Sequence, residues 1–136
     1  EWSHQVELPE RAKNDDALSI SRAARELAQD RSVSNIAVFT HSGKTALLMS
    51  KTRPDVPILA CTPIIGTYHL LNLYWGVVPL VVPHASTLEE MVDSVDKALN
   101  KNNARAGQQV VLISGFPLDA NRPPNLALLH TLGEPS

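Results

Sequence analysis

The sequence contains a single cysteine, Cys61, so no disulfide can form within the chain. Cys61 ends the apolar run 58–61, where a small buried thiol is the ordinary explanation. The five histidines show no close pair along the chain and no flanking cysteine or carboxylate at ligand spacing, so the sequence predicts no metal site. These features favour a cytoplasmic protein.

Long hydrophobic runs and long basic runs are also missing. The longest apolar stretch, residues 75–83, is far too short to span a bilayer. The net charge is -2, and no run of basic residues exceeds two, so no electrostatic footprint marks a nucleic acid or an anionic membrane as a partner. We therefore expect a soluble protein that binds neither.

What the sequence does contain is enough apolar material for one globular domain. It has 136 residues, of which 43% are hydrophobic. Residues 1–13 show no clear period and include Pro9, so we expect a leader or linker there and a packed domain over 14–136.

Hydrophobic periodicity along the domain alternates between two kinds of segment. A first helix is indicated by apolar residues spaced by three and four from Ala17 to Ala28, with Asn14 and two aspartates available to cap it. Short apolar runs predict strands, and amphipathic segments between them predict helices. The predicted strands are 35–40, 58–62, 77–82, 109–114 and 126–132, and the further helices are 43–52, 66–75 and 87–103.

Short strands that alternate with helices predict a mostly parallel sheet, because parallel strands need crossover helices that cover both faces. The expected fold is therefore α/β, a three-layer sandwich around five strands. No helix separates the last two strands, so they should pair antiparallel, with the final strand at an edge. Such sheets bind ligands beyond the carboxyl ends of their strands, which directs attention to the loops that open at Thr40, Thr62, Pro83 and Gly115.

The loop 40–45 has the chemistry of an anion site. Thr40, Ser42 and Thr45 supply hydroxyl groups, Gly43 lets the backbone approach closely, and Lys44 adds positive charge. The start of the following helix would offer unpaired N–H groups. A phosphate would suit this loop, but a polar turn that only caps the helix is an equal alternative on residue chemistry alone.

Two sharper interpretations of this loop are disfavoured. A P-loop requires a glycine five residues before Gly43, and that position is Val38. A hydrolase that uses Ser42 with His41 or His84 lacks the glycines of a nucleophile elbow and an orienting acid. We therefore expect neither a nucleoside-triphosphate site nor hydrolase chemistry at this loop.

Four segments together resemble the C-terminal domain of pyruvate kinases. The first three are a Thr-x-Ser-Gly loop, an Arg-Pro-x-x-Pro-Ile segment and a Thr-Pro after the second strand; the fourth is a Trp-Gly-Val-x-Pro junction. They occur in the family's order and spacing, and the likeness extends over residues 15–133. The segments here are 37–46, 50–60, 61–63 and 73–80.

The resemblance implies a five-stranded α/β domain that packs beside a catalytic barrel and helps to form a homo-oligomer, a tetramer in the family. It also implies a phosphorylated sugar effector, with its phosphate held by Thr40, Ser42, Gly43, Lys44 and Thr45. The barrel would hold magnesium, potassium and the substrates, so this domain should need no cofactor. The resemblance thus implies that this domain has no catalytic residues and, on its own, no pyruvate kinase activity.

Two departures from the family pattern bear on the effector. Members that bind fructose bisphosphate tend to have a glycine-rich loop between the last two strands, whereas residues 116–125 contain no glycine. The predicted helix 87–103 also lacks a tryptophan that would clamp a second phosphate. The resemblance therefore favours a sugar monophosphate, with Arg122 nearby. A free-standing sugar-phosphate or nucleotide-binding protein of the same fold is the alternative function.

Overall fold

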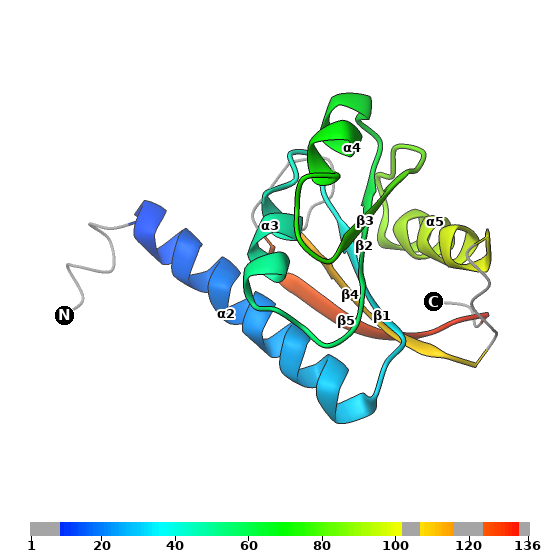
Figure 1. Cartoon of the computed structure of the whole chain (residues 1–136), viewed down its shortest axis with the longest axis horizontal. Helices are drawn as coiled ribbons and strands as arrows, with labels where there is room; N and C mark the ends of the chain where they lie inside the picture. Colours follow the sequence, from blue (N-terminus) through cyan, green and yellow to red (C-terminus); the bar gives the residue numbers. More distant parts are fainter. Residues whose placement is uncertain (1–8, 102–106, 116–123, 134–136) are drawn as a thin grey trace.

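The computed structural model describes residues 9–101, 107–115 and 124–133. Helices and strands alternate along this part of the chain, as the hydrophobic periodicity predicts (Figure 1). The elements are α2 (Pro9–Arg31), β1 (Asn35–Phe39), α3 (Lys44–Lys51), β2 (Ile58–Thr62), α4 (Ile65–Leu71), β3 (Val77–Val81), α5 (Leu88–Lys101), β4 (Gln109–Ser114) and β5 (Leu126–Thr131).

The five strands form one sheet in the order β3-β2-β1-β4-β5. The pairs β1 with β2, β2 with β3 and β1 with β4 are parallel. Strand β5 runs antiparallel to β4, with Val110 opposite His130, and forms one edge of the sheet. The predicted α/β fold with an antiparallel edge strand at its C-terminal end is thus confirmed.

Helices cover both faces of the sheet, and α5 lies on the side opposite α2 and α3 (Figure 1). Alternate residues of β1 point to opposite faces of the sheet, because successive side chains of a strand point in opposite directions. Ile36 and Val38 pack in the core with α2 and α3, whereas Ala37 and Phe39 pack in the core with α5. The central strands are therefore buried on both sides, which explains their continuous apolar sequences.

Two helix boundaries differ by several residues from the sequence-based expectation. Helix α2 begins at Pro9 rather than near Asn14, so part of the expected leader is helical. Proline is favoured at the first helical position, where no N–H is required. Helix α4 ends at Leu71, four residues before the expected Trp75, and a turn leads to Gly76 at φ +70°. The domain boundary at residue 14 stays a prediction.

Within the described ranges, no helix combines the length and the apolar character needed to cross a membrane.

Candidate functional site

The loop between β1 and α3 is held by two hydrogen bonds to its own hydroxyl groups. The N–H of Gly43 donates to Oγ1 of Thr40 at 3.0 Å, and the N–H of Lys44 donates to Oγ of Ser42 at 3.3 Å. Gly43 has φ +91°, a left-handed conformation that glycine adopts without steric cost. The loop therefore has a defined turn that leads directly into the helix.

The first turn of α3 leaves backbone donors without helical partners. The N–H of Leu47 bonds to the carbonyl of Gly43 at 3.0 Å and is the first of the regular helical series. By helix geometry, the N–H groups of Thr45 and Ala46 precede that series and have no acceptor within the helix. The partial positive charge of a helix N-terminus adds to these donors. The arrangement suits an anion.

The predicted phosphate-binding residues lie together at this loop, at the carboxyl end of β1. Thr40, Gly43 and Thr45 are buried, whereas Ser42 and Lys44 are exposed. The loop thus has a buried inner side, while the hydroxyl of Ser42 and the side chain of Lys44 are accessible to solvent. The remaining predicted residue, Arg122, lies outside the described residues.

Two histidines meet beside the loop, although they are far apart in the sequence. The ring centroids of His41 and His84 are 5.5 Å apart, with an interplanar angle of 59°. His41 belongs to the loop itself, and the edge of its ring also faces Phe39 at 6.2 Å. Partial burial, and to a lesser degree the neighbouring His84, lowers the pKa of His41 from its ordinary 6.5.

Helix α4 supports the loop from the neighbouring strand connection. The buried Thr67 donates its hydroxyl hydrogen to the carbonyl oxygen of His41 at 2.6 Å. A Cβ placed on Gly43 would lie 3.5 Å from side-chain atoms of both Leu71 and Thr67. The backbone of the loop is therefore packed directly against α4.

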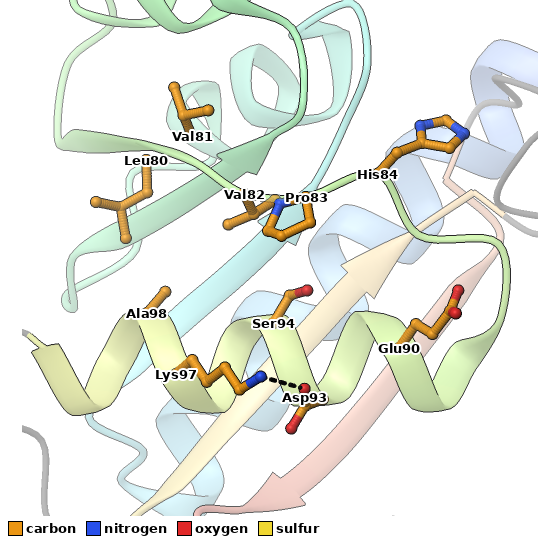
Figure 2. A pocket seen from close by; sticks show the side chains of 10 residues that line it. All are labelled: Leu80, Val81, Val82, Pro83, His84, Glu90, Asp93, Ser94, Lys97 and Ala98. Atoms are coloured by element: carbon orange, nitrogen blue, oxygen red, sulfur yellow. Dashed lines mark ion pairs between the residues drawn. The ribbon is translucent and has the colours of Figure 1, made fainter.

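A groove of about 450 Å³ lies between the end of β3 and helix α5, and His84 lines it (Figure 2). One wall is apolar and comes from residues 80–83, whereas the α5 wall carries Glu90, Asp93 and Lys97. The carboxylate of Asp93 pairs with the ammonium of Lys97 at 3.0 Å (Figure 2). The groove is thus a mixed surface whose charges are partly matched with each other.

A second surface has the opposite character. All the large hydrophobic side chains that are exposed in the described part of the chain lie in α4, in the segments that flank it, or in β3. We call the following residues the α4–β3 surface: Ile64, Ile65, Leu70, Leu73, Trp75 and Val81. Val78 points to the other face of the sheet, the face of Leu80 and α5. Residues 56–88 contain no Asp, Glu, Lys or Arg, so this surface has no charge of its own except through histidine.

Strand β3 is the second edge of the sheet and pairs only with β2. Pro79 in the middle of β3 has no N–H, which blocks continuous pairing with a further strand. The guanidinium of Arg53 stacks on the ring of Trp75 at 4.4 Å. A partner of this surface would therefore pack against side chains rather than extend the sheet.

Two further observations concern potential metal ligands and the cysteine. No group of three or more potential metal ligands occurs among the residues whose side chains the structure describes. Cys61 is fully buried, and burial raises its pKa to about 12. The sequence suggested His84 beside the loop only as a base for Ser42, in the disfavoured hydrolase interpretation, and no local motif predicted Thr67 as a neighbour of the loop.

The fold and the site together define an α/β domain with an anion-type loop at the carboxyl end of a central parallel strand. Residues 18–130 match the family model described as pyruvate kinase, alpha/beta domain. The chain belongs to this family, which confirms the resemblance that its sequence motifs carry.

Individual relatives agree with the family. The chain is 39% identical over 100 residues to a pyruvate kinase of Agrobacterium vitis, which covers 73% of this chain and 21% of that protein. It is 32% identical over 117 residues to a pyruvate kinase of Geobacillus stearothermophilus, which covers 85% and 20% respectively. The chain therefore spans about a fifth of the length of these curated relatives.

Proposed function

We propose that this chain is the regulatory and assembly domain of a pyruvate kinase and that its 40–45 loop binds the phosphate of a sugar effector. The parent reaction would be the glycolytic transfer of phosphate from phosphoenolpyruvate to ADP, in the cytoplasm. The observation that carries the effector role is the loop itself, where free helix N–H groups, hydroxyls and one lysine converge at the carboxyl end of β1.

The loop's donors have complementary tasks in this proposal. The N–H groups of Thr45 and Ala46 would hold the phosphate oxygens, and the exposed Ser42 hydroxyl would donate a further hydrogen bond. Thr40 accepts from Gly43 and can still donate its own hydrogen, and Lys44 adds charge from the rim. Hydrogen bonds to a charged group contribute about 1.5–3 kcal/mol each, so several together support millimolar or tighter binding.

The effector class follows from the number of anion-binding groups. The residues of the 40–45 loop form one phosphate site, which favours a sugar monophosphate. We expect Arg122 to lie near the sugar in the assembled enzyme.

The α4–β3 surface supports the assembly role. Interface cores are depleted of charged residues and enriched in tryptophan and other large apolar side chains. The surface has this composition: it carries Trp75 at 56% exposure and Leu73 at 78% exposure, and its sequence is uncharged. We propose that the catalytic barrel of the parent enzyme covers it and that the assembled enzyme is a homo-oligomer.

Calorimetric titration with ribose 5-phosphate and glucose 6-phosphate tests the effector role, and fructose 1,6-bisphosphate tests the preference for a monophosphate. The variant Ser42→Asp should abolish binding, because its carboxylate would occupy the anion position and repel the ligand. The control Ser19→Asp adds the same charge on the exposed side of α2 and should bind as the wild type does. If the wild type binds none of these sugar phosphates at several millimolar, the loop is only a helix cap. The same conclusion follows if Ser42→Asp binds them as well as the wild type does.

A second measurement tests the lack of catalytic residues. The isolated chain should not form ATP from phosphoenolpyruvate and ADP in the presence of magnesium and potassium, because the proposal places all substrate and metal contacts in the barrel. Turnover by the pure protein above a no-enzyme control would refute that placement. The genomic reading frame around this segment then separates the parent enzyme from a free-standing sugar-phosphate or nucleotide-binding protein.

A further inference from the structure

The two imidazoles beside the loop come from different elements and have no acidic partner among the described residues. His41 directly precedes Ser42, and His84 lies between β3 and α5. Their centroids are 5.5 Å apart, so two protonated rings would repel each other at close range. His130 shows the contrasting arrangement, since its Nε2 lies 2.8 Å from Oδ1 of Asp96.

The charged groups that line the groove with His84 already have other partners. The carboxylate of Glu90 accepts the N–H of Ser86 at 2.8 Å and that of Thr87 at 3.3 Å. Asp93 pairs with Lys97 at 3.0 Å. In the described part of the chain, no ion pair joins either imidazole of the pair to a carboxylate.

Among the residues that the structure describes, the other neighbours of His41 supply no negative charge. Strand β1 presents the ring of Phe39, and α4 presents Thr67, whose hydroxyl is bonded to the His41 carbonyl. On the loop itself the charged side chain is Lys44, which is positive. The lowered pKa of His41 agrees with these surroundings and means that its neutral form predominates near neutral pH.

From this geometry we infer that His41 and His84 form a proton-linked anion subsite beside the loop. A doubly charged oxyanion, such as a phosphate ester or sulfate, would supply the negative charge that the imidazole pair lacks. Each imidazole that becomes protonated gains a charge-assisted hydrogen bond to the anion. Binding therefore takes up protons, and affinity rises as the pH falls.

This inference rests on the proposed anion-binding function and extends it from a fixed phosphate site to one regulated by pH. The sign of the pH dependence follows from the linkage between anion binding and proton binding. If the bound anion raises the pKa of an imidazole by one unit, the affinity well below that pKa exceeds the affinity well above it about tenfold.

Sulfate is the appropriate probe, because it stays doubly ionised throughout the range in which histidine titrates, whereas a phosphate ester does not. We expect calorimetric titration of the whole chain to show affinity about tenfold tighter at about pH 5.5 than at about pH 8. Circular dichroism at both pH values verifies that the fold is unchanged. Histidine ring resonances in NMR should show the pKa of His41 rising when sulfate is present.

The variant His84→Gln should bind sulfate with a much weaker pH dependence, since it removes one imidazole and the repulsion that acts on His41. The control His69→Gln removes an exposed histidine of α4 and should keep the wild-type pH dependence. If sulfate binds with equal affinity at both pH values, the proton-linked subsite is refuted and the effector loop stands. If sulfate binds at neither pH, the effector loop is refuted and the subsite with it.

Discussion

The loop after β1 and the α4–β3 surface are neighbours that handle polarity in opposite ways. The loop gathers hydroxyls, backbone donors and a lysine around one turn, and its inner residues are buried. The surface carries exposed apolar side chains from an uncharged segment. Directional donors suit a small anion, whereas a broad apolar face gains free energy only when another large surface covers it. In the proposed function, one domain thus presents two surfaces for recognition, one polar and directional and the other broad and apolar.

Strand β2 lies between β1, which precedes the loop, and β3, which belongs to the α4–β3 surface. The burial of Cys61 in β2 therefore tests the packing of the core beneath both regions. With a pKa of about 12 instead of 9.0, its thiolate fraction at pH 8 falls about a thousandfold. We expect labelling by a thiol reagent to be slower by at least that factor than in urea-unfolded protein. If Cys61 of the folded protein is labelled as fast as Cys61 of the unfolded protein, the thiol is not buried and the described packing around β2 is wrong.

The same thiol gives a pH dependence of stability. The unfolded chain loses the thiol proton near its ordinary pKa of 9.0, whereas the folded chain keeps it until about 12. The free energy of unfolding should therefore be unaffected by Cys61 below pH 9 and should fall between 9 and 12. Urea unfolding of Cys61→Ala alongside the wild type isolates this contribution, because the variant lacks the thiol.

Two glycines sharpen the comparison, since Gly43 belongs to the loop and Gly66 to α4. Gly43→Ala should lower the free energy of unfolding by about 1–2 kcal/mol, because its φ of +91° is unfavourable for a residue with a Cβ. Gly66→Ala should raise it by about 0.5–1 kcal/mol, because the site is helical with no atom within 4 Å of the added Cβ. Urea denaturation measures both, and equal effects of the two changes would contradict the distinction.

The smallest expected effect concerns the isolated chain without its partner. Trp75→Ala should cost at most about 1 kcal/mol, because the residue is 56% exposed and its ring carries the stacked Arg53. In the parent enzyme the same change should strongly weaken the docking of the catalytic barrel on this domain, as measured by limited proteolysis. A large loss of stability in the isolated chain would show that Trp75 serves the domain's own core instead.

Sequence reasoning succeeded where local patterns decide the structure. The strands are continuous apolar runs with glycine, proline or polar boundaries, and β2 and β4 were predicted with their observed bounds. It failed at the end of α4, because apolar residues continue at helical spacing to Tyr74 while the backbone already turns.

Features that depend on the spatial order of strands could not be predicted in this way. The run 77–82 has the composition of a buried strand, but its position at an edge leaves Val78 and Val81 exposed. The loop 40–45 was identified as a candidate anion site from its residue types. The sequence also predicts that the connections after β1 and β3 open at the same edge of the sheet. The close approach of the His41 and His84 rings was not predicted, because it depends on the order of the strands and the path of each connection.

The hydrogen bond from Thr67 to the carbonyl of His41 connects α4 directly to the loop after β1. Helix α4 therefore links this loop mechanically to the α4–β3 surface. One side of this helix contributes to the exposed apolar surface, and the other holds the backbone of the loop through a single buried hydroxyl. A partner that shifts α4 would move the His41 carbonyl directly, because the two are joined by a hydrogen bond. The backbone N–H groups that follow His41 in the loop would move with it. By thermodynamic reciprocity, an anion that fixes the loop would then favour one docking position of α4 over another.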